Sequence, residues 1–432
     1  MSPDIPGDAP RSMPLSGFRV LDLSRIWAGP YCTKLLGDMG AQVIKMESTR
    51  VYDNHRGPIN PARGIAAYPD SEPGERPWNR NGWFNCLHMG QYGITLDLTA
   101  ESGREVFDSL VAISDVVIEN FRYGSLARLG YSYEEMRKLR PDLVYVSMPA
   151  FGNTGPWKRY LAYGIGQEQL SGMAHITGYR GQGPMKSGIN HGDPITGSHA
   201  AGAILVALRY RRKTGKGMFI DVSQQESAVA LIGPQLLGYQ MTGVEPERRG
   251  NRSELYAPHN TYRCLGEDRW VAIAATSDGE WQRLCRAMGR DDLARDAGLA
   301  TAVGRRARED EIDGAVSAWT RERDPYQVSH LLQGAGVPAA PVLDAPGLLA
   351  DPHYRDRGTF VEMDHPWAGR HHYPGLAWKM SRTPGDMGSP APGLGEHNRP
   401  VFRDMVGLTD AQVDRLEGDG VIGAVPTGSR VI

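Results

Sequence analysis

Asp193 is the residue whose type and position most directly suggest chemistry. It stands between Gly192 and Pro194, just before a run of small and apolar residues at 195–208. A carboxylate before a proline at a predicted helix start is typical of an N-cap, which is a structural role. The same place faces the positive end of the helix dipole, so we expect the carboxylate to stay ionised and to face a ligand. An ionised carboxylate can also be a covalent nucleophile, and the residues alone leave both roles open.

A second group of candidates is cationic. His55 and Arg56 lie close in sequence to Arg50 and Arg63. An arginine presents a forked pair of donors that fits a carboxylate, so this segment is a candidate site for an acidic substrate. The alternative interpretation is a solvated loop surface.

Two glycine-bearing turns resemble nucleotide-binding motifs without matching them. The turn at 24–30 contains one glycine, Gly29, followed by proline, and so lacks the three glycines of a dinucleotide-binding turn. The segment 214–217 follows a predicted helix and has no upstream glycine, which is typical of a helix C-terminal cap and not of a P-loop. The sequence therefore does not predict a nicotinamide, flavin or P-loop site.

Composition and charge narrow the class of protein. The 432 residues are enough for two or three domains, and 48 Lys and Arg nearly balance 50 Asp and Glu, which argues against a nucleic-acid partner. The four cysteines are widely spaced, which predicts free thiols in a reducing compartment and no metal site. No apolar stretch reaches the roughly 20 residues that cross a bilayer, and the N-terminus lacks a signal peptide pattern. We expect a cytoplasmic protein with no membrane partner.

The elements that position these residues alternate between strands and helices. Strands are expected at 18–23, 43–46, 116–119 and 143–146, and helices at 30–39, 101–113 and 133–139. A strand, a helix and a strand within about 30 residues form a βαβ unit with parallel strands. This arrangement places the turn at 24–30 at the carboxyl edge of the sheet, where α/β folds bind ligands. The N-terminal half is therefore predicted to be a doubly wound α/β fold.

The composition also predicts domain boundaries. We expect a disordered tail at 1–16, a large domain at 17–225, a linker at 226–248, a smaller α+β domain at 249–345, and a linker with a return to the large domain at 346–432. In the smaller domain, residues 265–275 predict a hairpin, followed by a helix that begins near Asp278. The Gly-, Pro- and Ser-rich stretch at 374–392 predicts an extended linker.

Several long motifs, in order along the chain, carry a resemblance to one family. They are LSGFRVLDLSRIWAGPYCTKLLGDMGAQVIKMES, IENFRYGSLARLGYSYEEMRKLRPDLVYVSMPAFGNTGP, EQLSGM, GDPITGSHAAGAILVALRYRRKTGKGMFIDVSQQE, GVPAAPV and LGEHN. From about Leu15 to Ile422 the chain resembles the class III CoA-transferases, the CaiB/BaiF family. The resemblance implies a Rossmann-like large domain built from both chain ends, a smaller domain, and two subunits interlocked as a homodimer.

The resemblance also implies roles for individual residues. Asp193 matches the family's nucleophile, which attacks an acyl-CoA donor to form an aspartyl-acyl anhydride and then an aspartyl-CoA thioester. The implied CoA contacts are Arg25, Ile26, Ala28, Leu96, Asn120, Phe121 and Arg128. The candidate substrate contacts are Trp27, His55, Arg56, Tyr163 and Glu168. CoA and its thioesters are then substrates, and no permanently bound cofactor is implied.

Two departures bear on the substrate. Trp27 stands where formyl-CoA transferases carry glutamine, and residues 251–260 lack their glycine-rich loop. The pattern looks more like members that use succinyl-CoA and larger dicarboxylic acids such as benzylsuccinate. Racemases of α-methylacyl-CoA thioesters share the fold, but Tyr163 stands where their catalytic histidine would be, and tyrosine is a poor base near neutral pH. The other alternative is a catalytically silent CoA-binding subunit of a hetero-oligomer, against which the intact Asp193 argues.

Overall fold

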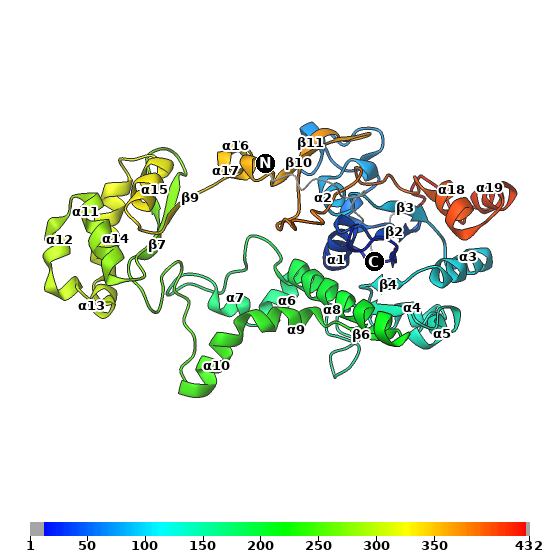
Figure 1. Ribbon diagram of the computed structural model, residues 1–432, viewed down its shortest axis with the longest axis horizontal. Helices are drawn as coiled ribbons and strands as arrows, with labels where there is room; N and C mark the ends of the chain where they lie inside the picture. The colour runs from blue at the N-terminus through cyan, green and yellow to red at the C-terminus, as the bar shows by residue number, and fades with distance from the viewer. Residues whose placement is uncertain (1–12, 429–432) are drawn as a thin grey trace. The chain divides into compact units, whose positions relative to one another are not determined.

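The computed structural model describes residues 13–428, and the chain divides into two compact units. The first unit combines the segment that ends at Ala174, the segment Lys186–Val244 and the segment that begins at Asp356. The second unit consists of His175–Met185 and Glu245–Arg355. Segments near both ends of the chain therefore contribute to the first unit, as the blue and red ribbons of Figure 1 show.

A six-stranded parallel sheet forms the centre of the first unit, in the order β3-β2-β1-β4-β5-β6 (Figure 1). The strands are β1 (Arg19–Asp22), β2 (Gln42–Glu47), β3 (Tyr92–Thr95), β4 (Val116–Glu119), β5 (Val144–Ser147) and β6 (Met218–Asp221). The direction of winding reverses between β1 and β4, and α/β folds bind ligands beyond the carboxyl ends of the strands at such a point. The predicted Rossmann-like α/β class is confirmed by this sheet.

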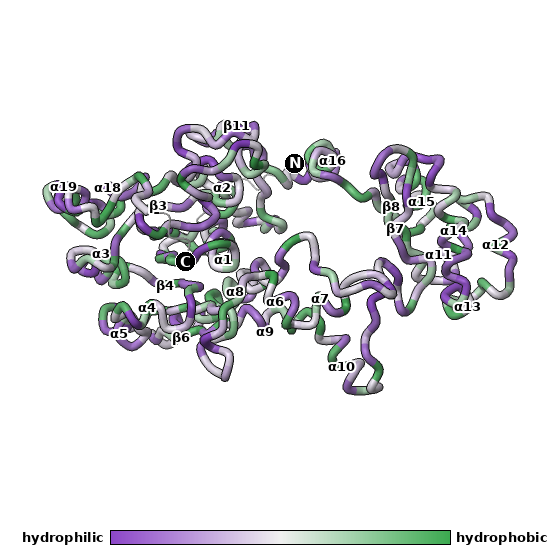
Figure 2. Tube along the Cα trace, turned by 180° about the vertical axis from the view of Figure 1, so that it is seen from behind, coloured by the Kyte–Doolittle hydropathy of each residue, from purple (hydrophilic) through white to green (hydrophobic). Residues whose placement is uncertain are grey.

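Helices cover both faces of the sheet. Successive strand residues point to opposite faces, and because both sets are apolar, each face must be buried. Leu21 and Val117 pack into one buried cluster, and their neighbours Val20 and Val116 pack into the other. The helices on the first face are α3 (Glu101–Ala112), α5 (Tyr133–Leu139) and α19 (Asp410–Gly418), and those on the second are α1 (Ala28–Asp38) and α8 (Gly192–Thr214). Figure 2 shows that α1 and α8 carry green, apolar stretches. The buried members of this second layer include Leu36 of α1 and Ile204 of α8.

The predicted elements of the first unit agree with the observed ones to within a few residues. The strand at 116–119 has the predicted bounds, and α5 is capped by Ser132, whose side chain accepts a hydrogen bond from the Glu135 backbone. The helix α8 ends at Thr214, with Gly215 in the left-handed conformation at φ 71°, so the predicted C-terminal cap is confirmed. The shorter elements here are α2 (Gly82–Leu87), α4 (Ser125–Arg128), α6 (Gly164–Leu170) and the hairpin of β10 (Phe360–His365) with β11 (Gly369–Pro374). The short helix α7 (Met173–Ile176) contains the boundary between the two units.

The second unit packs helices on a small antiparallel sheet. Its strands are β7 (His259–Arg263), β8 (Trp270–Ala274) and β9 (Ala339–Val342), and its main helices are α11 (Asp278–Met288), α14 (Glu309–Thr320) and α15 (Pro325–Gly334). The predicted hairpin and the helix beginning at Asp278 are confirmed, and Ser277 with Glu280 forms a capping box at that helix start. Trp281 anchors the core of this unit and is fully buried.

Three predicted boundaries need correction. Of the predicted tail, residues 1–12 lie outside the described residues, but Leu15 is buried and its backbone N–H donates to Met39 O at 3.0 Å. The predicted linker at 226–248 contains most of α9 (Gln224–Val229) and all of α10 (Gly233–Thr242), because Pro234 and Gly243 delimit a stretch of helix-forming residues. The smaller unit also extends past 345 to Arg355 and includes His175–Met185. Within residues 13–428, no helix has the length and apolar character needed to span a bilayer.

Candidate active site

Asp193 lies at the second position of α8 and not at its N-cap, which is His191. The predicted N-cap role is therefore wrong for this helix. The carboxylate instead lies near the backbone of Ala28, the first residue of α1, and this contact lowers its pKa. Trp27 is the N-cap residue of α1, and an indole has a donor but no acceptor. Asp193 thus brings a negative charge close to the N-terminus of α1.

Glycines bring three helix starts close to this carboxylate. A Cβ on Gly164, the first residue of α6, would lie 2.1 Å from Asp193 Oδ2. A Cβ on Gly197 of α8 would lie 2.6 Å from the Ala28 carbonyl oxygen. Any other residue at these two positions would have to displace the carboxylate or the start of α1. The starts of α6, α8 and α1 therefore enclose Asp193.

This enclosure changes the acidity of Asp193. The side chain is buried, with a 6% exposed fraction. Burial, and secondly the nearby carboxylate of Glu168, raise the pKa of Asp193 to about 7, while the contact with the Ala28 backbone opposes the rise. The prediction of a fully ionised carboxylate at neutral pH is thus corrected, because desolvation outweighs the favourable helix ends. A carboxylate that titrates near neutrality is more basic than an ordinary aspartate, which favours a chemical role.

Two substrate-contact candidates lie on α6 beside Asp193. Glu168 is buried, and its oxygens accept hydrogen bonds from Ser187 Oγ at 2.9 Å and from the His191 backbone N–H at 2.6 Å. Glu168 therefore holds the segment that leads into Asp193. Tyr163 is the N-cap residue of α6 and is 56% exposed.

The CoA-contact candidates after β1 and β4 meet at the point where the sheet reverses. The Arg25 backbone N–H donates to Asn120 Oδ1 at 2.8 Å, and Asn120 Nδ2 donates to Arg25 O at 2.7 Å. The Arg25 guanidinium lies over the Phe121 ring, 5.2 Å from its centre. Residues about 95 positions apart in sequence thus form one polar and aromatic surface at the carboxyl edge of the sheet.

The remaining turn residues lead from this surface towards Asp193. Ile26 has a φ of 69°, which is unusual for a β-branched residue. Trp27 packs edge-on against Trp83 at 5.6 Å between ring centres, and His55 lies 5.6 Å from Trp83 on the same measure. Trp83, which the sequence reasoning missed, is half-exposed and joins two substrate-contact candidates into one aromatic wall.

The structure assigns a different environment to Arg56 than the sequence suggested. Arg56 is fully buried; its Nη2 lies 2.7 Å from Glu47 Oε2, and it also donates to the carbonyls of Trp78 and Pro392. These contacts occupy the forked donors that a substrate carboxylate would need. Arg56 therefore stabilises the fold, whereas its neighbours Arg50 and Arg63 are exposed. Leu96 is buried, and its backbone N–H donates to Glu47 O at 2.8 Å.

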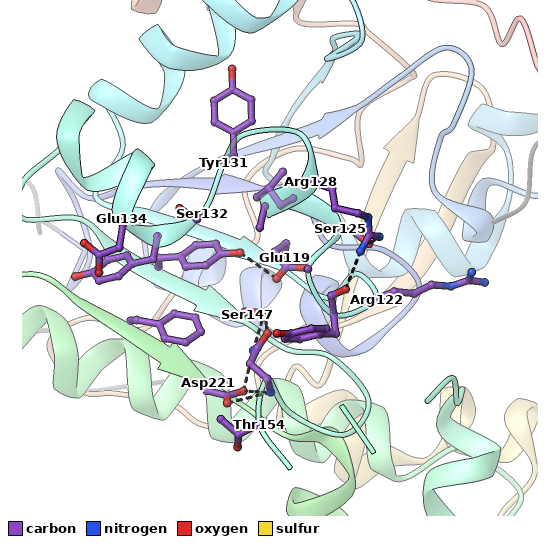
Figure 3. A pocket seen from close by; sticks show the side chains of 18 of the residues that line it. Glu119, Arg122, Ser125, Arg128, Tyr131, Ser132, Glu134, Ser147, Thr154 and Asp221 are labelled. Atoms are coloured by element: carbon purple, nitrogen blue, oxygen red, sulfur yellow. Dashed lines mark hydrogen bonds between the residues drawn. The ribbon is translucent and has the colours of Figure 1, made fainter. Parts of the chain in front are cut away.

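A cavity of about 1020 Å³ opens at the carboxyl ends of β4, β5 and β6 (Figure 3). Arg122, Arg128 and Arg159 line it, together with an aromatic group of Tyr133, Tyr145, Phe219 and neighbouring residues. Glu119 lies inside it and accepts a hydrogen bond from Tyr145 Oη at 3.1 Å. Burial raises the pKa of Glu119 to about 7. The cavity thus combines arginine donors with flat apolar walls, and Arg128 is the CoA-contact candidate that lines it.

Comparison with known proteins identifies the class. Residues 15–398 match the family model for CoA-transferase family III. The chain is 34% identical over 410 residues to the succinyl-CoA–D-citramalate CoA-transferase of Chloroflexus aurantiacus, which covers 95% of this chain and 98% of that protein. It is 35% identical over 412 residues to the succinyl-CoA:mesaconate CoA-transferase of Haloarcula marismortui, covering 94% of this chain and 99% of the relative. The chain belongs to CoA-transferase family III and is an enzyme of that class.

A solved structure supports the same assignment. The crystal structure of a CaiB/BaiF family protein from Brucella suis superposes with a TM-score of 0.82 at 30% identity, covering 92% of this chain and 100% of that chain. The family recognised from the motifs is therefore confirmed. Acyl-CoA thioesters are substrates of this class. Among the described residues, no three His, Cys, Asp or Glu side chains are grouped as a metal ion would require.

Several residues near the site carried no signal in the sequence. Gly164 and Gln167 lie in α6 beside Asp193, and a Cβ on Gly192 would lie 2.5 Å from Gln167 Oε1. Asp53 Oδ1 accepts a hydrogen bond from the backbone N–H of Ile26, in the β1–α1 turn, at 3.2 Å. The acidic start of the segment DNHR could have pointed to Asp53, since an aspartate there caps the next turn through the His55 N–H.

Proposed function

We propose that this enzyme transfers CoA from succinyl-CoA to a dicarboxylic acid, with Asp193 as the covalent nucleophile. The observation that carries the proposal is the enclosure of one buried carboxylate, with a pKa of about 7, by three helix starts. Support for the donor and the acceptor class comes from relatives named as succinyl-CoA-dependent transferases for citramalate and mesaconate.

In the proposed reaction, Asp193 carries first the acyl group of the donor, then CoA, and then the acyl group of the acceptor. The ionised Asp193 attacks the thioester carbonyl, the C–S bond breaks, and CoA thiolate leaves behind an aspartyl-acyl anhydride. The thiolate then attacks the aspartyl carbonyl, which releases the donor acid and forms an aspartyl-CoA thioester. The acceptor carboxylate attacks the aspartyl carbonyl of this thioester, the C–S bond breaks, and CoA thiolate leaves behind a second anhydride. The thiolate then attacks the acceptor carbonyl of this anhydride, which forms the acceptor thioester and regenerates Asp193. Each intermediate keeps the acyl activation, so the enclosure must exclude water.

The residues around Asp193 suit these steps. The backbone of Ala28 lies near the carboxylate, and in the tetrahedral intermediates its N–H would stabilise the developing oxyanion. Acylation converts Asp193 into a neutral group and thereby removes its repulsion with Glu168. Part of the energetic penalty that burial imposes on the ionised nucleophile is therefore released in the first step.

We assign the CoA site to the carboxyl edge of the sheet after β1 and β4 and to the cavity that Arg128 lines. Arg25 and Arg128 would bind phosphate groups, and Phe121 would pack against the adenine region. Asn120 fixes the backbone of Arg25 and so preorganises this surface. Ile26, Ala28 and Leu96 would contribute backbone and apolar contacts to the pantetheine.

We assign the acid substrate to the space bounded by α6 and the aromatic wall. Trp27 and His55 would bound the acyl chain, and the exposed Tyr163 hydroxyl would donate to a carboxylate. Glu168 would affect the binding of the acid indirectly, because it fixes the segment from Ser187 to His191 that precedes Asp193. The bulk of Trp27 and Trp83 is consistent with acids larger than oxalate.

The exposed apolar surface of the first unit supports a dimer. The helix α10 is exposed along its length and presents Leu237 and Met241, and the outer side of α8 presents Val206 at 69% exposure. Monomeric proteins rarely leave such apolar rows exposed. We propose the interlocked homodimer of the family, with a hetero-oligomer of related chains as the alternative. The four free cysteines support a reducing, cytoplasmic location.

The test is an activity screen with the purified full-length chain. Succinyl-CoA is supplied with a panel of dicarboxylic acids, and new thioesters are identified by mass spectrometry. The proposal expects thioester products with dicarboxylates, and expects Asp193→Asn to abolish them while the variant keeps the wild-type circular dichroism spectrum. Thioester formation by the Asn variant at the wild-type rate would overturn the assignment of the nucleophile.

A further inference from the structure

A buried cluster of charged residues lies beneath the β1–α1 turn, and the chemistry above does not use it. Lys45, Asp53 and His88 are each fully buried. Lys45 Nζ lies 3.2 Å from Asp53 Oδ2, and His88 Nε2 lies 3.8 Å from the same oxygen. Burying ionised groups is costly even when they are paired. The cluster lies under the edge of the sheet that α/β folds use to bind ligands, so its contacts with the β1–α1 turn bear on ligand binding.

The second oxygen of Asp53 is directed at the turn itself. Asp53 Oδ1 accepts the backbone N–H of Ile26 at 3.2 Å and that of His55 at 2.9 Å. Ile26 is the only β-branched residue with a positive φ among residues 13–428. Such a conformation persists only where surrounding contacts enforce it. Asp53 supplies one of these contacts from outside the turn.

Lys45 holds the other side of the same turn. Its ammonium group donates to the carbonyl oxygen of Ser24, two residues before Ile26. Asp53 is fixed in turn from behind, because its backbone N–H donates to Glu47 Oε1 at 2.8 Å and Glu47 is paired with Arg56. The chain of contacts therefore runs from Arg56 through Glu47 and Asp53 to the backbone of Ile26.

The turn that these contacts fix is the part of the site that faces both substrates. Arg25 precedes Ile26 and extends towards Phe121, while Trp27 and Ala28 follow and lead to Asp193. A change of the Ile26 backbone conformation would redirect Arg25. Ala28 is less sensitive, because it is fully buried against α8 and fixed by packing.

We propose that Asp53 is a positioning residue for CoA binding, and that with Lys45 it clamps the β1–α1 turn in the conformation that presents Arg25 to the ligand. The assignment of CoA as the ligand rests on the proposed function. The clamp itself is a property of the free protein and can be tested without any substrate.

The test compares Asp53→Ala with Asp53→Asn in the full-length chain. Asp53→Ala removes both amide contacts, so hydrogen–deuterium exchange in the peptide around Ile26 is expected to accelerate. The KM for acyl-CoA is expected to rise about tenfold or more, the loss typical of a hydrogen bond to a charged group, with kcat changed by less than about threefold. Asp53→Asn keeps an oxygen that can accept both backbone N–H groups but loses the charge that pairs with Lys45. It is expected to exchange more slowly around Ile26 than Asp53→Ala and to bind acyl-CoA more tightly than that variant.

Asp115→Ala is the matched control. Asp115 is also a buried aspartate; it accepts the Arg19 backbone N–H at 2.7 Å and pairs with Arg211 at 2.8 Å. It precedes β4 at the amino ends of the strands, the opposite edge of the sheet. Its loss is expected to lower the melting temperature but to leave the KM for acyl-CoA unchanged, so general destabilisation is separated from positioning.

The outcomes separate this inference from the proposed function. Unchanged exchange around Ile26 in Asp53→Ala would overturn the clamp, whatever the enzyme binds. Faster exchange with an unchanged KM would overturn the positioning role and leave CoA transfer intact. A wild-type protein that binds no CoA by calorimetry would overturn the proposed function, while the exchange experiment would still decide on the clamp.

Discussion

Asp193 is held in an environment that makes its ionised form unfavourable. Burial and Glu168 raise its pKa to about 7, so at pH 8 the folded chain carries a penalty that the unfolded chain does not. Below about pH 4, the pKa of an aspartate in the unfolded chain, Asp193 is protonated in both the folded and the unfolded state. The penalty grows as the pH rises from about 4 to about 7. Asp193 therefore lowers the stability of the folded chain at neutral and alkaline pH, as the proposed reactive role would require.

Replacement of Asp193 by Asn is expected to stabilise the fold in a pH-dependent way. At pH 8 the variant should unfold at a higher denaturant concentration than the wild type. Its free energy of unfolding should be larger by at most ~4 kcal/mol, the value that corresponds to a pKa raised to about 7. This gain in stability should shrink as the pH falls from about 7 and should vanish at about pH 4, the pKa of an aspartate in the unfolded chain. Urea unfolding across the pH range measures it. A variant that is less stable than the wild type at pH 8 would contradict the assigned electrostatics.

Glu168 gives a second prediction at the level of single residues. Its negative charge raises the pKa of Asp193, so Glu168→Gln should lower that pKa. The acidic limb of the pH dependence of kcat/KM, where Asp193 must lose its proton, should then move to lower pH. Glu168→Asp keeps the charge and serves as the control. An acidic limb that stays in place in the Gln variant would show that Asp193 does not set it.

At the scale of elements, the site depends on helix starts that approach one another through glycine. Gly164→Ala would place a methyl group 2.1 Å from Asp193 Oδ2, so the carboxylate must move. We expect kcat to fall by about a hundredfold, the effect of misplacing a reacting group by about 1 Å. Steady-state kinetics with saturating substrates measures this.

Gly314→Ala in α14 is the control for the Gly164 experiment. Within the described part of the chain, nothing lies within 4 Å of a Cβ placed on Gly314. Alanine is favoured over glycine inside a helix, so this variant should gain about 1 kcal/mol of stability and keep full activity. Equal activity of the two variants would contradict the close enclosure of Asp193.

The elements were predictable where their signals are local. The strand at 116–119 and the hairpin before Asp278 follow from alternation, β-branching and turn residues. The enclosure of Asp193 was not predictable, because Gly164 and Ala28 approach it through tertiary packing that leaves no spacing in the sequence. Arg56 illustrates the converse, since a cationic residue typical of a binding loop is neutralised by Glu47 inside the fold. The role of Asp193 came from a family resemblance and not from its local pattern, which indicated a cap.

At the scale of the whole molecule, the exposed apolar face of α10 predicts association. Leu237→Glu with Met241→Glu would place two charges in the proposed interface, where their desolvation is costly. Light scattering after size exclusion should then show monomers where the wild type shows dimers, with much reduced activity. Val303→Glu changes an isolated exposed residue of the second unit and should leave the dimer intact. A monomeric wild-type protein would contradict the proposal.

The central claim is that Asp193 is covalently acylated during CoA transfer, and an oxygen-isotope experiment tests it most directly. The acceptor acid is supplied with heavy oxygen in its carboxylate, together with succinyl-CoA, and the digested protein is examined by mass spectrometry after several turnovers. The thiolate removes the acceptor acyl group from the anhydride, so each turnover should leave one heavy oxygen on Asp193, and after several turnovers the carboxylate should carry one or two heavy oxygens. Labelled thioester product with an unlabelled Asp193 would contradict the account, because the acid would then have reacted without passing through that carboxylate.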